Sequence, residues 1–341
     1  MPYFTDYHRT KHSLTLAIKA SLLTMLSVLA SACHTVSPIV DSEPTVTVTP
    51  SIALVLGGGG AKGFAHVGVI KALESNGITP TLIVGTSVGS IIGSVYASGY
   101  SAERLERLAL TTTDNELMDF TLSNQGFVAG LKLKNFINTQ VRQQPIEDFP
   151  IRFAAIAAEQ NTLKKTVFTN GEAGVAVQAS SSVPNIFIAP RIPKNGGKKY
   201  IDGGVVSLVP VDSARDLGAD IVIAVDVTAP IHKASPINNP LNSIDSLLSI
   251  TSLSSFWSLL ENSLITNASA SGSMHNRNTT MRLERDRADI IIIPKVGHLS
   301  SVDSSQRRAL IAAGEQATNE QMTAIKRLIA TQSQSSYATL Q

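Results

Sequence analysis

Short runs of mostly apolar residues alternate with segments of helical spacing from residue 51 onward. The runs are bounded by turn residues, which is typical of buried strands, and we expect strands at 52–56, 82–86, 152–158, 165–169, 220–226 and 289–294. Apolar residues three and four apart predict helices at 62–73, 90–97, 102–110, 135–142 and 304–330. Alternating strands and helices imply right-handed crossovers, so the pattern predicts an α/β fold whose largely parallel sheet is covered on both faces.

The first 32 residues follow a different pattern, which predicts a secretory signal. Residues 1–20 hold the positive charges, and residues 21–30 form an uncharged and largely apolar stretch. That stretch is shorter than the roughly 20 residues that span a bilayer as a helix, so a retained transmembrane anchor is the less favoured alternative. The small residues Ala30–Ala32 then precede Cys33, as at the cleavage site of an exported protein.

Cys33 is the one cysteine of the chain, and its surroundings resemble a bacterial lipoprotein signal. In such signals the cysteine becomes the lipidated first residue. The chain departs from the pattern at Ala30, where a branched residue is usual, so cleavage by an ordinary signal peptidase is the alternative, with Cys33 as a free thiol. Both routes cut after Ala32 and export the protein. With lipidation, His34 in place of an aspartate implies an outer-membrane anchor facing the periplasm.

The remaining chain divides into a tether, a folded domain and a tail. Residues 33–50 are rich in Pro, Thr, Val and Ser without helical periodicity, which predicts an extended tether. We expect the folded domain at 51–330 and a flexible tail at 331–341. Within the domain, 233–285 least resembles a core scaffold, and its apolar residues near helical spacing predict either a packed helix or a cap that faces a membrane through Trp257.

Composition excludes several classes of protein. Of the 341 residues, 43% are apolar and 16% charged, which excludes intrinsic disorder for the bulk of the chain. The net charge of +2 arises in the signal, because 25 basic and 25 acidic side chains follow from residue 33, so no global charge favours nucleic acid. A single cysteine excludes a disulfide framework, and no His, Cys and carboxylate residues stand at ligand spacing, so we expect no metal.

A glycine-rich turn follows the first predicted strand. Gly57–Gly60 lead into the helical segment 62–73. Glycines let a backbone approach a ligand closely and N–H groups at a helix start attract negative charge, so this geometry receives anions. Gly58, Gly60 and Gly63 also fit the GxGxxG pattern of dinucleotide sites. Such a site needs an acidic residue about 20 positions on. None stands there, and the chain also lacks the Lys-Ser/Thr of a P-loop at this turn.

The second predicted strand leads into a GxSxG motif, formed by Gly85, Thr86, Ser87, Val88 and Gly89. In this motif the serine lies at a sharp corner between strand and helix, where the two glycines prevent a steric clash. The motif is frequent by chance. Its place after an apolar strand and downstream of the glycine-rich turn nevertheless favours Ser87 as a nucleophile.

A nucleophilic serine needs a base, and the sequence offers two candidates. The familiar triad has Ser, then Asp or Glu, then His in chain order, and His298 follows Ser87 in that order. The competing candidate is Asp202, which closes a short predicted strand before Gly203 and Gly204. Glycines at these positions let the backbone pass close to a neighbour. The residues alone leave a triad and an aspartate base both open.

Three motifs in this order resemble the patatin-like phospholipase family, namely GGGGAKG at 57–63, GTSVG at 85–89 and DGG at 202–204. The resemblance runs from about Ile52 to Asp226 and includes the segment Gln178–Pro184. It implies a three-layer α/β/α fold with a mainly parallel central sheet. It also implies a carboxylic ester hydrolase of the phospholipase, lysophospholipase or esterase type, which acts on acyl esters of phospholipids or other lipids without a cofactor.

The resemblance also assigns roles to residues. The family's Ser-Asp dyad would make Ser87 the nucleophile and Asp202 the proton acceptor, with an acyl-enzyme intermediate. Backbone N–H groups of the glycine-rich loop would form the oxyanion hole, in the stretch Gly58, Gly59, Gly60, Ala61, Lys62 and Gly63. To serve as a base, Asp202 needs a raised pKa in a partly desolvated site. An acyltransferase with the same acyl-enzyme and a non-catalytic lipid-binding protein are the alternatives.

Two further features have simple interpretations. His66 lies in the first predicted helix, and we favour a packed, hydrogen-bonded side chain over a catalytic one. The basic clusters at 164–165, 198–199 and 282–287 are expected to be solvated faces, with contact to phospholipid head groups as the alternative. The expected partners are a lipid substrate and a membrane surface, with no nucleic acid, and the sequence gives no oligomeric state.

Overall fold

The computed structural model describes residues 50–228, 272–297 and 306–338, all within a compact unit that spans Val48–Gln341. The predicted signal, the tether up to residue 49 and most of the predicted cap lie outside the described residues.

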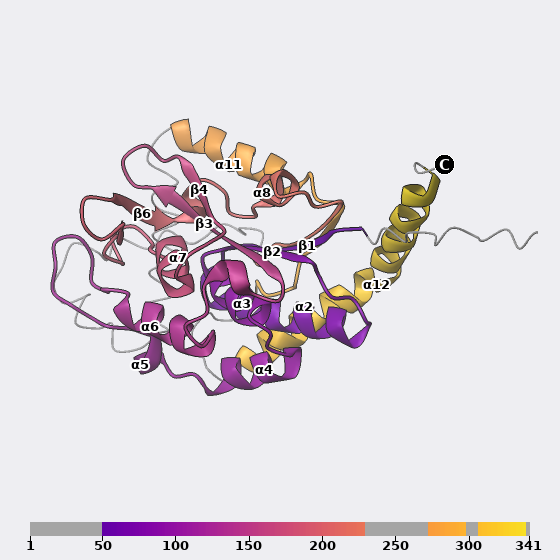
Figure 1. Ribbon diagram of the computed structural model, residues 1–341, viewed down its shortest axis with the longest axis horizontal. Helices are drawn as coiled ribbons and strands as arrows, with labels where there is room; N and C mark the ends of the chain where they lie inside the picture. The colour runs from indigo at the N-terminus through magenta and orange to yellow at the C-terminus, as the bar shows by residue number, and fades with distance from the viewer. Residues whose placement is uncertain (1–49, 229–271, 298–305, 339–341) are drawn as a thin grey trace, which may run out of the picture. The chain divides into compact units, whose positions relative to one another are not determined.

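The described elements follow the predicted alternation of strands and helices (Figure 1). The strands are β1 (Ile52–Leu56), β2 (Leu82–Thr86), β3 (Arg152–Glu159), β4 (Lys165–Phe168), β5 (Arg191–Ile192), β6 (Lys198–Asp202), β7 (Ile221–Val225) and β8 (Ile290–Ile292). The α-helices are α2 (Phe64–Ser75), α3 (Val88–Ala97), α4 (Ala102–Thr111), α5 (Asp114–Leu117), α6 (Leu131–Gln140), α7 (Ala173–Ser180), α8 (Val211–Asp216), α11 (Gly272–Arg285) and α12 (Gln306–Ala338). Short 3₁₀ helices are η1 (Gly60–Gly63), η2 (Ile146–Asp148) and η3 (Gly203–Val205).

The sheet has the order β5-β6-β3-β2-β1-β7-β8, with β4 paired to β3. The pairs that join β3, β2, β1, β7 and β8 are parallel, while β4, β5 and β6 pair antiparallel with their neighbours. Side chains of β1 alternate between two cores: Leu54 and Leu56 pack with α2, α3 and α12, and Ala53 and Val55 pack with α8. Helices therefore cover both faces (Figure 1), which confirms the predicted three-layer α/β/α class.

Strands β2 and β6 meet end to end along one edge of β3. The other edge of β3 is occupied by β4, because Ala155 and Ala157 each have a β4 partner in addition to the one from β2 or β6. Thr86, the last residue of β2, lies opposite Ile156, and Asp202, the last residue of β6, lies opposite Ala157. These β3 residues are consecutive, so two strands that run in opposite directions end at the same point of the sheet.

Helix α12 packs along α2 through glycines on both helices. A Cβ on Gly68 would lie 1.8 Å from the Ile311 carbonyl oxygen, and one on Gly314 would lie 1.9 Å from the Ala65 carbonyl oxygen. The helix continues to Ala338, so most of the expected flexible tail at 331–341 is helical. No Gly or Pro interrupts residues 331–338, and the helix has no local signal to end earlier.

Candidate active site

Ser87 occupies a strained backbone position between β2 and α3. Its φ of 55° and ψ of −125° lie outside the regions that non-glycine residues ordinarily adopt. A Cβ on Gly85 would lie 2.5 Å from the Gly89 carbonyl oxygen, and one on Gly89 would lie 2.0 Å from the Leu56 carbonyl oxygen. Both glycines are therefore required for α3 to start this close to β1 and β2, as the GxSxG pattern predicts.

Hydrogen bonds hold the Ser87 backbone from two sides. Its N–H donates to the Ser180 Oγ at 3.0 Å, at the end of α7. Its carbonyl oxygen accepts from the Ser90 N–H at 2.8 Å and from the Ser90 Oγ at 2.7 Å. The residue is 8% exposed, so these contacts fix a largely buried serine at the carboxyl end of its strand.

Asp202 closes β6 directly beside this corner. A Cβ on Gly203 would lie 2.2 Å from the Ile156 carbonyl oxygen, which shows how closely the turn after Asp202 crosses β3. The N–H of Asp202 donates to the Ser182 carbonyl oxygen at 2.8 Å, so the last residue of α7 and the segment directly after it contact Ser87 and Asp202 respectively. The glycines of the DGG motif therefore permit the close approach that the sequence suggested.

The Asp202 carboxyl group is buried and only half satisfied. The residue is 2% exposed, and its Oδ1 accepts from the Gly204 N–H at 2.7 Å. Its Oδ2 has no hydrogen-bond partner among the described residues. Burial raises the pKa of Asp202 to about 6, although the nearby Ser87 hydroxyl and the Gly204 N–H both act to lower it. This carboxyl group can therefore exchange a proton near neutral pH, with Oδ2 available to do so.

The glycine-rich loop presents fewer free N–H groups than the sequence suggested. The Gly57 N–H donates to the Val225 carbonyl oxygen at 3.1 Å, and the Gly58 N–H donates to the Leu208 carbonyl oxygen at 3.0 Å. Gly58 was expected in the oxyanion hole, but here its N–H is occupied because the chain after Asp202 passes alongside. The N–H groups of Gly59 and Gly60 donate no hydrogen bond to the described part of the chain, and they precede the η1 turn that opens α2.

Gly63 joins this loop to the serine corner. A Cβ on Gly63 would lie 2.3 Å from the Val88 Cγ2, the residue directly after Ser87. Ala61 and Lys62 are buried in the same turn. The absence of a side chain at Gly63 therefore lets the glycine-rich loop pack directly against the residue after Ser87.

His66 is a structural residue, as the sequence suggested. It is fully buried on α2, and its Nε2 donates to the Gly57 carbonyl oxygen at 2.8 Å. Since a carbonyl can only accept, the proton lies on Nε2, and Nδ1 has no hydrogen-bond partner in the described chain. Burial lowers the pKa of His66 to about 4, so the imidazole is neutral and anchors the start of the glycine-rich loop.

Two supports of the site were not predicted from the sequence. Ser180 holds the Ser87 backbone, and only its place in the segment Gln178–Pro184 had drawn attention to it. The second support is Glu284 of α11, a buried carboxylate that accepts from the Ser207 Oγ at 2.8 and 2.9 Å. The Ser207 carbonyl oxygen in turn accepts from the Thr86 Oγ1 at 2.9 Å, next to Ser87. Neither bond has a signal in local sequence pattern, because the partners are distant along the chain.

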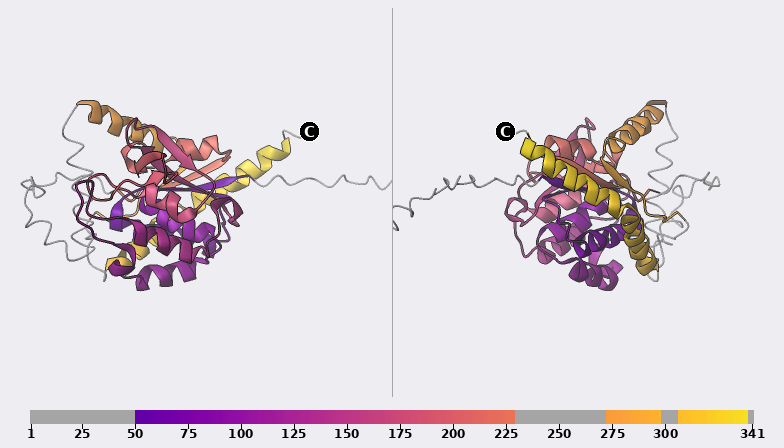
Figure 2. Two further views of the ribbon diagram at one scale, coloured as in Figure 1. Left: turned by 60° about the vertical axis from the view of Figure 1, so that its left-hand side comes forward. Right: turned by 90° about the vertical axis from the view of Figure 1, so that its right-hand side faces the viewer.

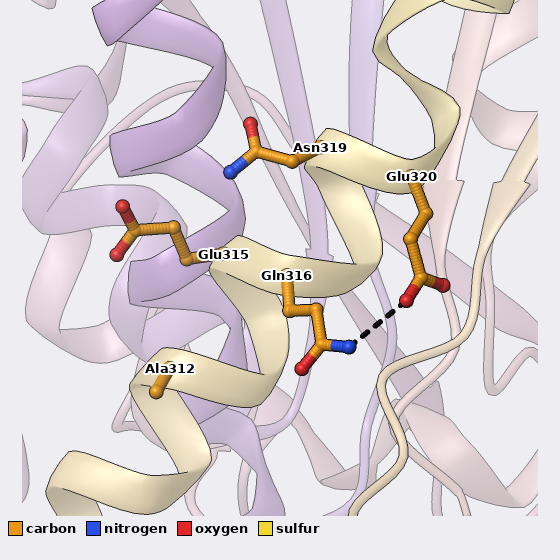
Figure 3. A pocket seen from close by; sticks show the side chains of 5 residues that line it. All are labelled: Ala312, Glu315, Gln316, Asn319 and Glu320. Atoms are coloured by element: carbon orange, nitrogen blue, oxygen red, sulfur yellow. Dashed lines mark hydrogen bonds between the residues drawn. The ribbon is translucent and has the colours of Figure 1, made fainter.

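The described residues do not include every expected feature. His298, the competing base, and Cys33 lie outside the described residues. Within the described ranges, no three metal-ligating side chains cluster together, and no helix is both long and apolar enough to cross a bilayer. A surface depression on α12 is lined by Ala312, Glu315, Gln316, Asn319 and Glu320 (Figure 3). These side chains belong to one exposed helix face, where Gln316 donates to Glu320 at 3.0 Å, and they have no contact with the serine corner.

Comparison with known proteins identifies the domain. The family profile described as Patatin-like phospholipase matches residues 54–215. Patatin-like phospholipase domain-containing protein 6 of Mus musculus is 34% identical over 183 residues, which are 52% of this chain and 13% of that protein. An uncharacterized NTE family protein of Mycobacterium tuberculosis is 33% identical over 198 residues, which are 55% of this chain and 53% of that protein. The chain thus spans a small part of the first relative and about half of the second.

The fold has a counterpart among solved structures. VipD from Legionella pneumophila aligns with a TM-score of 0.54 and 14% identity, over 81% of this chain and 67% of that one. At this identity the likeness concerns the fold alone. The sequence match, by contrast, contains the glycine-rich turn, the serine corner and the aspartate turn that the structure brings together. Residues 54–215 of this chain thus match the patatin-like phospholipase family in sequence.

Proposed function

We propose that this protein hydrolyses carboxylic ester bonds of lipids, with Ser87 as the nucleophile and Asp202 as its base. The observation that carries the proposal is the end-to-end meeting of β2 and β6, which sets a strained serine beside a buried, half-satisfied carboxyl group. The family match and the curated relatives named as phospholipase domain proteins support a lipid ester as the substrate.

The first half of the reaction forms an acyl-enzyme. The Ser87 Oγ attacks the ester carbonyl carbon while its proton passes to the Asp202 Oδ2. The carbonyl oxygen becomes an oxyanion and accepts hydrogen bonds from the N–H groups of Gly59 and Gly60. The C–O bond to the alcohol then breaks, and the departing alkoxide takes the proton from Asp202. The acyl group remains on Ser87.

The second half reverses these roles with water as the nucleophile. A water molecule attacks the acyl carbonyl carbon while Asp202 accepts its proton. The bond to the Ser87 Oγ breaks, the serine regains its proton from Asp202, and a fatty acid leaves. Because Asp202 must be ionised to accept a proton, the rate is expected to fall as pH drops through its pKa of about 6.

The test combines covalent labelling with product analysis. We expect a fluorophosphonate probe to label the wild-type chain and not Ser87→Ala, while Ser98→Ala, a change at the other end of α3, still labels fully. Asp202→Asn should slow hydrolysis of a defined phospholipid by about 10²–10⁴-fold. His298→Ala should keep wild-type activity. Full labelling of Ser87→Ala, or loss of activity in His298→Ala with retention in Asp202→Asn, would contradict the dyad.

Oxygen-18 water separates a hydrolase from an acyltransferase. If water is the acceptor, the released fatty acid acquires heavy oxygen, measured by mass spectrometry. A product ester without the label would assign the acyl group to another hydroxyl acceptor.

We also propose that the protein is an exported lipoprotein that is acylated at Cys33. The support is the signal-like sequence before this cysteine. Expression in a bacterium with radioactive palmitate should label the wild-type chain and leave Cys33→Ala unlabelled. Equal labelling of both would exclude acylation at this residue.

A further inference from the structure

The turn between β5 and β6 carries basic side chains that have no acidic partners. Arg191, Lys194 and Lys199 form no ion pair within the described residues, and Arg191 and Lys194 are exposed. Lys198 pairs with Glu159 at 2.7 Å, whereas Lys199 donates to the neutral Gln125 at 2.8 Å. We call residues 191–199 the basic hairpin. The hairpin precedes Asp202 along the chain, with Lys199 three residues and Lys194 eight residues before it, so its uncompensated charge leads into the strand that carries the candidate base.

The loop between α5 and α6 places apolar side chains in solvent next to this hairpin. In this loop Leu122 is 99% exposed and Phe120 is 52% exposed, and Leu131, the first residue of α6, is 54% exposed. We call these three residues the apolar tip. They make up most of the large apolar side chains that are exposed in the described part of the chain, the others being Leu283 and Ile293. The described chain thus concentrates exposed apolar surface in this loop and at the first residue of the helix that follows it.

The buried cluster under this loop contains none of the residues of the apolar tip. Met118 and Val128, on the inner side of the loop, already pack against Phe187 in this small cluster. Asp119 caps the start of α6, where its carboxylate accepts from the N–H groups of Gly130 at 2.7 Å and Leu131 at 2.8 Å. That carboxylate is therefore satisfied by backbone groups. Phe120 and Leu122 are left outside the cluster, which leaves them available to an apolar phase.

Backbone hydrogen bonds fix the loop close to the site. The N–H groups of Phe127 and Val128 donate to the Ile186 carbonyl oxygen at 2.8 and 2.9 Å. Ile186 is four residues from Ser182, whose carbonyl oxygen accepts from the Asp202 N–H. The Cα atoms of Ile186 and Ser182 are therefore at most about 14 Å apart. Figure 1 shows β6 and the loop before α6 on the side away from the C-terminal end of α12, and the left view of Figure 2 shows the same for that loop.

We propose that the apolar tip and the basic hairpin together dock this protein onto an anionic lipid surface. Apolar side chains enter the boundary of the acyl chains, while cations beside them attract anionic head groups. The apolar tip and the cations lie on segments that the hydrogen bond from Lys199 to Gln125 joins, and a lipid surface with anionic head groups offers a partner to both. The inference rests on the proposed function, because a lipid hydrolase gains access to its substrate by presenting the Ser87 side of the sheet to the membrane.

A fluorescent label tests this docking directly. Cys33→Ala removes the one cysteine, so Leu122→Cys or Arg327→Cys then offers a unique labelling site in the full chain. Arg327 is exposed on α12 beside Lys326, which contacts Asn76 at the far end of α2 from the site, and it serves as the matched control. Both chains also carry Ser87→Ala, so that vesicles stay intact. The dye is NBD, whose emission rises in an apolar environment.

With phosphatidylcholine vesicles that contain phosphatidylglycerol, we expect emission at position 122 to rise by at least about twofold and shift to the blue. Emission at position 327 should stay unchanged. An equal response at both positions, or none at 122, would overturn the proposal. So would an apolar environment at 122 before vesicles are added, because another segment of the chain or a second copy would then cover the tip.

The charge contribution has its own test. Lys194→Gln in the chain labelled at 122 should weaken binding to the anionic vesicles by about fivefold and have little effect with phosphatidylcholine alone. Neutralising an exposed cation at the far end, Arg327→Gln, should leave binding unchanged. Equal effects of the two substitutions would contradict a local role for the hairpin.

These measurements do not depend on catalysis. If docking fails while the unlabelled wild-type chain hydrolyses a soluble short-chain ester, the surface proposal falls and the proposed function stands. If position 122 enters the lipid while Ser87→Ala retains full esterase activity, the proposed function falls and the docking surface stands.

Discussion

Ser87 directly follows the end of β2 and Asp202 ends β6 at the same point of the sheet, but the fold strains the two residues in different ways. The strain at Ser87 is conformational, since its backbone has a positive φ of 55°. Asp202 has an ordinary φ of −47°, and its strain is electrostatic, because the carboxyl group is buried with Oδ2 unpaired. The comparison teaches that the nucleophile is set by backbone geometry and the base by its surroundings. Different substitutions should therefore relax each one separately.

The largest effect is expected from breaking the serine corner at Gly89. A Cβ there would lie 2.0 Å from the Leu56 carbonyl oxygen, a backbone atom that cannot move aside. We expect Gly89→Ala to lower the free energy of unfolding by about 3 kcal/mol or more, measured by urea denaturation. Gly93→Ala, in the same helix, meets the Ile83 Cγ2 at 2.9 Å, a side-chain atom that can shift, so its loss should be clearly smaller. Equal losses would show that the corner has no special demand for glycine.

Removing the charge at Asp202 should relax the other strain. A carboxyl group whose folded pKa is raised from 3.8 to about 6 destabilises the fold as pH rises through this interval. Asp202→Asn should therefore be more stable than the wild type by about 3 kcal/mol at pH 8, while most of the difference vanishes by pH 4. Urea denaturation at both pH values measures it. A variant less stable at pH 8 would mean that the ionised carboxylate is stabilised in the fold.

His66 tests whether the glycine-rich loop depends on a neutral imidazole. Its folded pKa of about 4 lies below the ordinary 6.5, so the unfolded chain binds a proton first and stability is lost as pH falls from 6.5 toward 4. This group alone should remove about 2 kcal/mol between pH 8 and pH 5. His66→Gln keeps a side-chain N–H for Gly57 and should lack this part of the pH dependence. The same slope in both proteins would assign the acid loss to other groups.

The smallest expected effect concerns the serine backbone itself. Glycine adopts positive φ without strain, so Ser87→Gly should be more stable than Ser87→Ala by about 1 kcal/mol. Both lack the nucleophile, which makes thermal unfolding at one pH a fair comparison. If alanine were as stable as glycine here, the corner would relax on loss of the hydroxyl, and the strain at Ser87 would come from its side chain.

The sequence predicted those parts of the candidate site that depend on residues close together along the chain. Apolar runs gave the strands, and the glycines around Ser87 and after Asp202 marked the places where backbones pass closely, as the contacts of Gly89 and Gly203 confirm. The sequence pattern also predicted more free N–H groups in the glycine-rich loop than the structure has. Nothing near Gly58 in the sequence shows that its N–H donates to the Leu208 carbonyl oxygen. The supports from Ser180 and Glu284 were missed for the same reason, because the bond of Ser180 to Ser87 joins residues 93 positions apart and that of Glu284 to Ser207 joins residues 77 positions apart.

By itself the sequence predicted the α/β class, the resemblance to the family and the candidate residues Ser87 and Asp202, because strand, turn and helix follow from short-range steric and hydrophobic preferences. Tertiary structure alone decided which of these residues meet. The antiparallel pairing of β6 with β3, on the same edge as β2 and directly beyond its end, brings Asp202 to Ser87, and burial there raises the pKa of that carboxyl group. Strand register and desolvation depend on contacts between distant segments, and they become defined only when the sheet has formed.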